Sequence, residues 1–450
     1  QMCIRDRLST ESGGARLLDT ARNATGEALS YDTVSGSVAG GLTLSELRFE
    51  TEGVIVEIGL LYVEAQPTFV PLGVRVDNAR AESLSIQLVD TGEPPAEEFD
   101  LPSLLEALRL PLALSVDSLV ATKVNVRSDG ANLAHAESIA VSLAWQDSIE
   151  LTAFEVDGGK DFGISGSAAL GLSRPFDVNG EINARAGNAV TRLPEDVSAS
   201  LALAGTLDRL DVELSEATTE LRLQARLDDL TREPAWDATA SLAGLALNEQ
   251  ILLENVETSS TGTLQHFRLT VDGSVAGLID AAPARVSGRA SGSAEGFDIE
   301  ALTIEHPAVQ GASSGRLDFP LRYRGEVVLE TLALDYWAAS LAEPHRVSGS
   351  ADVAATAERL SIEAGHFELA GTDADVDIAG AIDLATGTLD AQVAWRELRW
   401  PLMSAAAQVE SREGRATVSG TLDDWRTEVS AALAAPNIAD GKLVATGAGT

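Results

Sequence analysis

A serine flanked by small residues is the first place where this sequence could do chemistry. Gly311-Ala312-Ser313-Ser314-Gly315 matches the Gly-x-Ser-x-Gly pattern of a nucleophile elbow, in which a strand-to-helix turn exposes the serine hydroxyl. An elbow needs a helix after the turn and a histidine in register. A strand-like segment, residues 316–319, follows instead, so we interpret the motif as a turn rich in glycine and serine.

Three aspartates have the spacing of calcium ligands. Asp373, Asp375 and Asp377 match the first three carboxylates of a calcium loop, but the sixth position is Ile378 where the loop needs glycine. A spacing of two also places side chains on one face of a strand. We therefore predict a solvated strand face rather than an ion site.

The histidines are too far apart along the chain to form a local metal site. They are His135, His266, His306, His345 and His366. We expect them at the surface or at strand ends. Trp395 and Trp400 could stack on a ligand, but strands favour aromatic residues without one, so we expect packing at a strand end. The sequence thus predicts no catalytic residue, no metal and no cofactor.

The charge of the chain excludes one class of partner. Lys plus Arg is 32 and Asp plus Glu is 69, which gives a formal net charge of −37 at pH 7. Phosphate backbones bind clustered cations, so nucleic acid is excluded as a partner. Hydrophobic residues still make up 45% of the chain, which is enough for folding, whereas the 4% of aromatic residues disfavours a compact aromatic-centred enzyme core.

The first seven residues differ in character from the rest. Residues 1–7 contain no apolar run and have no continuity with the segment that begins at Leu8, so we interpret them as a non-native scar. They include Cys3, the only cysteine, so no intramolecular disulfide can form. No window of about 18 apolar residues occurs, so the sequence as given contains neither a membrane span nor an intact signal peptide.

The dominant pattern of the chain is alternation with a period of two. In residues 138–145, Ile139, Val141 and Leu143 fall on one side and small residues on the other, as in a strand with one buried face. Turn signals such as Asn179-Gly180 separate similar stretches. Such a pattern, repeated almost from end to end, predicts strands that each have one apolar face.

The apolar positions that we assign to this face share the alternating spacing. They are Leu84, Ile86, Leu88, Ile139, Val141, Leu143, Leu201, Leu203, Val212, Leu214, Leu221, Leu223, Leu269 and Val271. An apolar sheet face has to be covered. Either the sheet closes on its own side chains as a sandwich or solenoid, or it curls into a trough filled by another apolar substance.

Helical signals are few. Residues 12–24 could form a short amphipathic helix, and Ser103 could cap one further turn that ends at Leu108. Residues 91–98 are polar and rich in proline, and we expect a loop there. We therefore predict an all-β fold, namely an elongated, curled, repetitive antiparallel sheet with a short N-terminal helix.

A short motif recurs at distant places. Gly-Thr-Leu-Asp begins at Gly205 and again at Gly420, and weaker copies are Ser165-Gly166-Ser167 and Ser348-Gly349-Ser350. We expect each glycine to lie where the sheet bends or twists. A supersecondary unit that is copied many times predicts a quasi-one-dimensional array.

Longer blocks of sequence resemble a known family. The first block is residues 34–49, followed by residues 54–58, and the second is residues 395–402, followed by Gly420-Thr421-Leu422-Asp423. By these blocks the chain, from about Leu8 onward, resembles the N-terminal periplasmic part of TamB proteins, within the AsmA-like group of bridge-like lipid-transfer proteins.

This resemblance implies a fold and a function. It implies a taco-shaped β-groove that holds phospholipid acyl chains and carries lipid across the periplasm between inner and outer membranes. It also implies an inner-membrane anchor before residue 8 and a TamA-like barrel partner in the outer membrane, reached through a region after Thr450. We expect residues 8–98 to form an N-terminal cap region of the groove and residues 99–450 to form the repetitive groove, truncated at its C-terminus.

Two other interpretations stay open at this point. An assembly factor for outer-membrane β-barrel proteins would use its strand edges as templates, and it would bind client polypeptide at an edge. A passive repetitive scaffold would have a polar or filled interior and would bind nothing apolar. A conduit would instead hold lipid in its groove.

Overall fold

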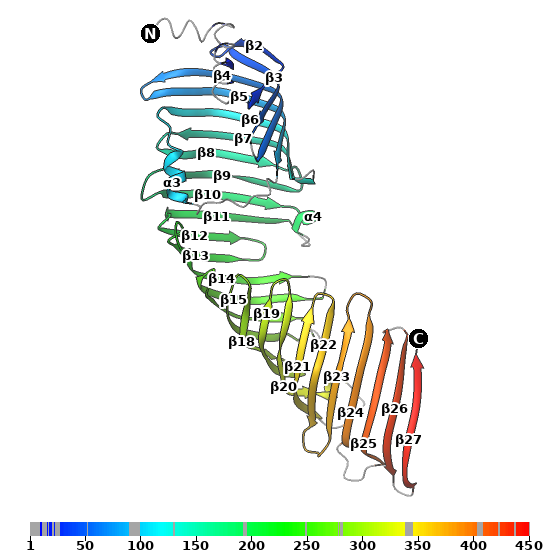
Figure 1. The fold of residues 1–450 in the computed structure, drawn as a ribbon. Helices are drawn as coiled ribbons and strands as arrows, with labels where there is room; N and C mark the ends of the chain where they lie inside the picture. The colour runs from blue at the N-terminus through cyan, green and yellow to red at the C-terminus, as the bar shows by residue number, and fades with distance from the viewer. Residues whose placement is uncertain are drawn as a thin grey trace. The chain divides into compact units, whose positions relative to one another are not determined.

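The computed structural model of the chain forms two compact units, unit 1 (Gln1–Ala238) and unit 2 (Thr239–Thr450) (Figure 1). The structure describes residues 28–51, 53–89, 100–128, 131–191, 196–247, 250–277, 282–337, 345–402, 408–421, 424–435 and 438–449, together with residues 10, 16, 18, 19, 22 and 279. Strand accounts for 75% of the structure and helix for 4%, which confirms the predicted all-β class. Within these residues, no helix is long and apolar enough to cross a membrane.

Unit 1 is an open sheet whose strands are stacked like rungs (Figure 1). Its strands are β1 (Leu29–Ser30), β2 (Thr33–Ser37), β3 (Gly41–Glu50), β4 (Val54–Phe69), β5 (Leu72–Leu88), β6 (Ala113–Ser128), β7 (Ala131–Trp145), β8 (Ser148–Asp157), β9 (Phe162–Gly171), β10 (Asp177–Ala186), β11 (Val197–Thr206), β12 (Arg209–Glu216) and β13 (Arg222–Asp228). Both β1 and β2 pair with β3, and α4 (Asn188–Thr191) follows β10.

One strand pair of unit 1 departs from the predicted antiparallel pattern. The strands β5 and β6 pair in parallel, and the chain between them contains α3 (Leu101–Ala107). A parallel pair requires a crossover connection rather than a hairpin, and the segment with α3 is that crossover. The sequence did not predict this pair because alternation is the same in parallel and antiparallel strands.

Unit 2 is also an open sheet, and β14 (Ala235–Ala246) spans the division between the units. Its further strands are β15 (Leu252–Thr263), β16 (Phe267–Ala276), β17 (Ala284–Ser293), β18 (Gly296–Glu305), β19 (Val309–Asp318), β20 (Arg322–Ala333), β21 (Arg346–Thr356), β22 (Arg359–Leu369), β23 (Asp375–Asp383), β24 (Thr388–Trp400), β25 (Val409–Thr421), β26 (Trp425–Ala435) and β27 (Ile438–Gly449). From β15 onward each strand pairs antiparallel with the next, and α5 (Leu334–Trp337) follows β20.

The sheet is a single layer, and few side chains are fully buried. The chain exposes 27525 Å², against about 16,000 Å² expected for a compact protein of 47.0 kDa. Within the described ranges, no second sheet packs against the apolar side, so a closed sandwich does not form. Some of the buried apolar residues form two small clusters in unit 1, whereas others, such as Ala308 and Leu369, are buried in unit 2.

The helix α3 covers the strand ends on one side of unit 1. We call these strand ends, together with α3, the α3 rim. Leu105 of α3 is buried against Leu172 and Phe176, which lie in the connection between β9 and β10. Trp145 at the end of β7 donates a hydrogen bond from Nε1 to the carbonyl oxygen of Leu108, at 2.9 Å. Helix α3 is therefore held against these strand ends by a small apolar cluster and one hydrogen bond.

The predicted start of α3 is wrong by three residues. The helix begins at Leu101 with Asp100 as its N-cap residue, and Pro102 stands in its first turn, where proline is tolerated. Ser103 therefore lies inside the helix, and its hydroxyl donates to the carboxylate of Asp100. In the predicted N-terminal helix, residues 16, 18, 19 and 22 are helical, and the rest of residues 12–24 lies outside the described residues.

Gly205 and Gly420 occupy equivalent positions, as predicted, but these are hairpin ends rather than bends within a strand. Their φ angles are +137° and +126°, and an added Cβ would lie 2.3 Å from the carbonyl oxygen of Arg209 and 2.2 Å from that of Asp424, respectively. The threonine after each glycine accepts a hydrogen bond from the backbone N–H three residues later. Gly262-Thr263 is a third copy, which the sequence comparison missed because glutamine replaces aspartate in its turn.

Candidate functional site

Apolar side chains of neighbouring strands meet in register on one face of unit 1. Ile182 of β10 faces Leu201 of β11, Leu201 faces Leu214 of β12, and Leu214 faces Leu223 of β13. Residues directly opposite one another in a sheet project to the same side. The four side chains therefore form one continuous row, and we call the side on which they lie the apolar face of unit 1.

This row continues in the other direction as far as β4. Successive partners beyond Ile182 are Gly166, Phe154, Val141, Leu119, Ala79 and Val63. A second row runs beside it through Val76, Val116, Leu143, Leu151, Ala168, Gly180, Leu203, Val212 and Ala225. The apolar face thus crosses the unit from strand to strand without a charged side chain in either row.

Most of the apolar positions predicted from the sequence fall on this face. Strand pairing joins Ile139, Val141, Leu143, Leu201, Leu203, Val212, Leu214 and Leu223 through adjacent rows. Leu221 is the residue just before β13. It stands two residues before Leu223, so its side chain continues the same side of the strand. Leu269 and Val271 lie on β16 of unit 2, next to Ala290 and Gly288 of β17.

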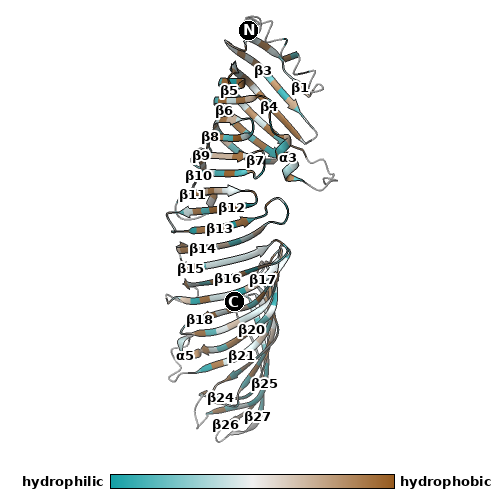
Figure 2. Cartoon of the chain, turned by 90° about the vertical axis from the view of Figure 1, so that its left-hand side faces the viewer, coloured by the Kyte–Doolittle hydropathy of each residue, from teal (hydrophilic) through white to brown (hydrophobic). Residues whose placement is uncertain are grey.

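The side chains of this face are half-buried. All of the predicted apolar positions have intermediate exposure except Leu88, which is 39% exposed. On the opposite side of the strands, Ser200, Glu213 and Gln224 are exposed. Figure 2 shows the alternation as brown and teal bands along the strands. The sheet therefore presents an uncovered apolar face and a solvated polar face.

Residues with a positive φ interrupt the long strands β5 and β6. Because of them, the apolar side chains before and after the interruption lie on the same face of the sheet. Ser83 of β5 and Lys123 of β6 have φ angles of +60° and +54°, which side chains other than glycine seldom adopt. At these positions the apolar spacing changes from two to three, so Leu84 packs in one cluster with Ala81 and Val124. The alternation rule alone missed this, although the spacing from Ala81 to Leu84 carries the signal.

In unit 2, glycines make room for aromatic rings of the adjacent strand. Aromatic rings lie over glycines of the adjacent strand, so that a Cβ added to Gly414 would be 2.2 Å from the ring of Trp395, and one added to Gly349 would be 2.7 Å from the ring of Phe367. Trp395 also donates from Nε1 to Ser411 Oγ at 2.9 Å. The predicted strand-end packing of the tryptophans is wrong for Trp395, which lies inside β24, while Trp400 ends that strand and is 54% exposed.

The polar faces are crossed by ion pairs between adjacent strands. Arg226 and Asp211 in unit 1 are directly opposite and 3.0 Å apart, as are Arg316 and Asp298 in unit 2 at 3.1 Å. Exposed pairs of this kind contribute about 0–1 kcal/mol each. Their main consequence is that these cations are engaged by neighbouring carboxylates.

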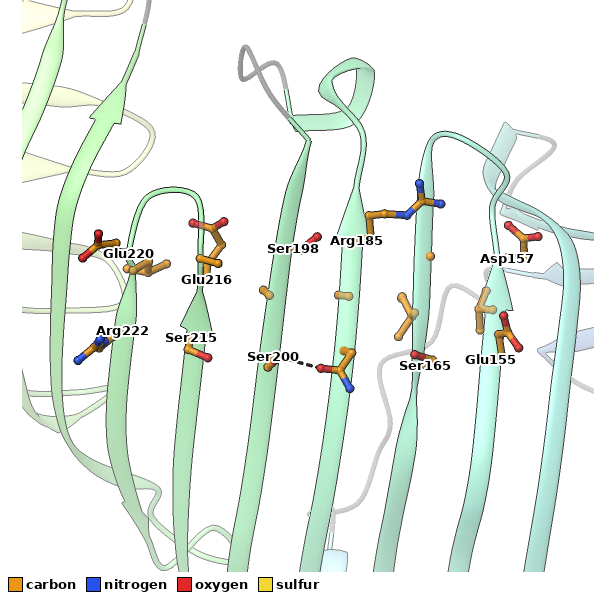
Figure 3. A pocket seen from close by; sticks show the side chains of 18 residues that line it. Glu155, Asp157, Ser165, Arg185, Ser198, Ser200, Ser215, Glu216, Glu220 and Arg222 are labelled. Carbon is orange, nitrogen blue, oxygen red and sulfur yellow. Dashed lines mark hydrogen bonds between the residues drawn. The ribbon is translucent and has the colours of Figure 1, made fainter.

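A hollow of about 710 Å³ lies over the ends of β8 to β13 (Figure 3). These strand ends are the ones remote from α3 (Figure 1). Serine side chains and charged side chains such as Glu155 and Arg185 line the hollow together with a few apolar ones, and Ser200 Oγ donates to Asn183 Oδ1 at 2.7 Å. Glu216, one of the lining residues, is 5% exposed. Burial raises the pKa of Glu216, but hydrogen bonds from Thr219 and Thr218 outweigh this and lower the pKa to about 2. A carboxyl with so low a pKa does not exchange protons near neutral pH, so Glu216 stabilises its turn and is a poor general acid or base.

His366, Asp375 and Asp377 bring potential metal ligands together. Their ligand atoms lie within 4.8 Å of one another, which the sequence spacing did not predict. His366 Nδ1 is 2.8 Å from Asp377 Oδ1, and this hydrogen bond raises the pKa of His366. Arg396 donates to Asp375 Oδ1 at 2.9 Å. A cation would have to displace Arg396 from Asp375 and break the hydrogen bond between His366 and Asp377, so the group is better described as a cross-strand polar network. Asp373 lies in the turn before β23, so only two of the three aspartates share the predicted strand face.

The remaining sequence motifs are structural. Ser313 lies inside β19 rather than in the predicted turn, and its hydroxyl is 2.5 Å from the hydroxyl of Tyr323, with no strand-to-helix elbow around it. His306 and His345 lie at strand ends, as predicted, but they are 3% and 5% exposed, so neither is a surface residue. His306 packs edge-on against Tyr336 of α5.

Comparison with known proteins agrees with this architecture. The family model for the TamB N-terminal domain matches residues 7–160 and 100–386, which is most of the chain. A search of curated proteins finds no match. The chain therefore belongs to the TamB family, whose members act in outer-membrane biogenesis as bridge-like transport or assembly proteins and are not known enzymes.

Proposed function

We propose that the apolar faces of this protein bind phospholipid acyl chains and carry lipid across the periplasm between the inner and outer membranes. One observation supports this most directly. The in-register apolar rows are half-buried and no second protein layer covers them in the described parts of the chain. A contiguous apolar surface of this kind marks a binding site for an apolar partner.

The rows also suit a cargo that has to move. Each methylene removed from water is worth about 0.8 kcal/mol, so an acyl chain on the face is held firmly relative to water. Leu201, Leu214 and Leu223 repeat one kind of contact from strand to strand, so neighbouring positions bind a chain about equally well. A lipid can then advance along the row without crossing a deep well, and no catalytic residue is required.

The charge of the protein acts on the lipid head group. Head groups remain in water at the rim of an open sheet, where a chain with a net charge of −37 repels anions. We expect weak binding of anionic head groups and better binding of zwitterionic ones. In this proposal the protein is held at the inner membrane and meets a TamA-like barrel in the outer membrane.

A second function remains within the role of the family. A factor that assembles outer-membrane barrels would use its strand edges as templates and would bind polypeptide there. The half-buried apolar rows favour lipid, because a strand added at an edge leaves the faces of the sheet uncovered.

Native mass spectrometry of the purified chain tests the proposal. We expect phospholipid masses on the protein as isolated, and we expect delipidated protein to bind phospholipid again from mixed micelles. Protein that carries no phospholipid after either treatment, or that carries only polypeptide, would contradict the proposal.

A further inference from the structure

The turn between β4 and β5 carries a group of exposed apolar side chains, which we call the lip. Phe69 is 56% exposed, Val70 95% and Leu72 60%, and Leu112, just before β6, is 45% exposed. Leu72 pairs with Phe69, and Gly73 pairs with Ala113, so the side chains of all three strands lie next to one another. The turn lies on the same side of unit 1 as α3 (Figure 1).

The lip is a continuation of the apolar face. Val76 belongs to the second apolar row, and Val74 and Leu72 follow it at intervals of two residues on the same side of β5. Val74 pairs with Pro67 of β4 and with Leu114 of β6, so the next row toward the rim is also apolar. The apolar lining of the unit therefore runs out of the sheet and ends in side chains that are open to solvent.

The lip itself carries no charge. Residues 65–74 and 110–116 contain no charged side chain, in a chain whose net charge is −37. The nearest ionised groups stand in ion pairs, in which Arg75 joins Asp77 and Asp117, and Arg109 joins Asp147, so two cations and three carboxylates leave a formal charge of −1 beside the lip. Carboxylates close to an anionic bilayer would be repelled, and at the lip there are none.

We propose that the lip inserts into the interface of a phospholipid bilayer and passes acyl chains between the bilayer and the apolar face. Exposed Phe and Leu side chains on an uncharged hairpin are the groups that partition into the boundary between head groups and acyl chains. The transfer of acyl chains rests on the proposed function. The insertion is argued only from the exposed apolar side chains of the lip.

Unit 2 has a matched control. Phe319 and Leu321 flank Pro320 at the β19–β20 turn, as Val70 and Leu72 flank Pro71, and Leu321 is 60% exposed. Phe319, however, packs edge-on against Phe297 with ring centroids 5.8 Å apart, and charged residues stand on both sides of the turn. This turn has the composition of the lip without its uncharged setting, so it is not expected to insert.

Flotation of the full chain with vesicles of phosphatidylethanolamine and a minority of phosphatidylglycerol tests the proposal. We expect the wild-type chain to float with the vesicles and the Phe69→Ser, Leu72→Ser double variant to partition at least about tenfold more weakly. Leu321→Ser should bind like the wild type. Circular dichroism establishes that the variants keep their strand content, which is expected because the substituted side chains are exposed.

A probe reports insertion independently of affinity. An environment-sensitive fluorophore at Val70→Cys, in a Cys3→Ser background, should shift to the blue with vesicles and be quenched by brominated acyl chains, whereas the same probe at Leu321→Cys should not. Three results would each contradict the insertion of the lip into the bilayer. They are a wild-type chain that does not float, a double variant that floats equally well, and a Val70 probe that brominated acyl chains do not quench.

The proposed function fails separately. If the chain carries phospholipid but the lip does not insert, the conduit stands without this entry site. If the lip inserts but the chain never carries phospholipid on its apolar face, the lip is a membrane contact only, and the conduit is wrong.

Discussion

Gly205 and Gly420 lie where the hairpin leaves no room for a side chain. Replacing either by valine puts a Cβ at 2.3 Å or 2.2 Å from a backbone oxygen, at a φ that side chains rarely adopt. We expect Gly205→Val and Gly420→Val each to lower the free energy of unfolding by about 1–3 kcal/mol in urea denaturation. Gly53→Ala is the control, because its added Cβ meets nothing within 4 Å. Variants that unfold at the same urea concentration as the parent would contradict the steric argument.

Glu216 makes the stability of its turn depend on pH. Its native pKa of about 2 lies below its ordinary value of 4.5, so the unfolded chain binds this proton more tightly than the folded chain. The resulting stability is fully present above about pH 4.5 and is lost as the pH falls toward 2. We expect Glu216→Gln to cost about 2–3 kcal/mol at neutral pH and to flatten the fall in stability within that window.

Glu213→Gln is the matched control, since Glu213 is exposed on the same strand. Urea denaturation at a series of pH values measures both variants. A Glu216→Gln variant whose stability follows pH as steeply as that of the parent would show that the turn does not depend on the ionised carboxylate.

At the scale of elements, α3 is held by very few side chains. Leu105 is 6% exposed and contacts Leu172 and Phe176, whereas Leu104 beside it is 46% exposed. We expect Leu105→Ala to lower the free energy of unfolding by about 2–4 kcal/mol, because it leaves a cavity under the helix. Leu104→Ala should change it by less than about 0.5 kcal/mol. Equal effects of the two substitutions would mean that the packing of the α3 rim is not as described.

The sequence predicted elements well where a local rule decides them. Alternation identified β7, β11 and β12, because a period of two is written in the side chains themselves. It did not reveal that β5 and β6 pair in parallel, since direction depends on the crossover and not on the strands. It also missed the shift of spacing at Ser83 and Lys123, because the only signal is the interval of three residues from Ala81 to Leu84, and a search for strict alternation does not detect it.

The candidate site also has features that the sequence predicts and features that it does not. The strand residues were predictable individually, and their alignment into rows follows from register, which hairpin lengths fix. The lip was not predictable from alternation, because Phe69 and Leu72 read as ordinary strand residues until their exposure is known. The group of His366, Asp375 and Asp377 arises from pairing between β22 and β23, which no sequence spacing reports.

At the scale of the whole molecule, a single-layered sheet allows a substitution on its apolar face to abolish lipid binding without unfolding the chain. Leu223 is half-buried on the open apolar face, so a charge there remains in contact with water when no lipid is bound. We expect Leu223→Asp to fold like the parent by circular dichroism and to lose co-purified phospholipid, because hydrocarbon cannot solvate the carboxylate. Gln224→Glu, on the exposed polar face of the same strand, should do neither. An unfolded Leu223→Asp chain would indicate a closed core instead.

Photo-crosslinking from the two faces of β11 tests the central claim most directly. Leu203 and its neighbour Ala202 lie on opposite faces of one strand, half-buried and exposed respectively. With a photoreactive phenylalanine at each position in turn, illumination in cells followed by mass spectrometry should give phospholipid adducts at Leu203 and none at Ala202. Polypeptide adducts at Leu203, or lipid adducts in equal yield at both positions, would contradict a lipid conduit on the apolar face.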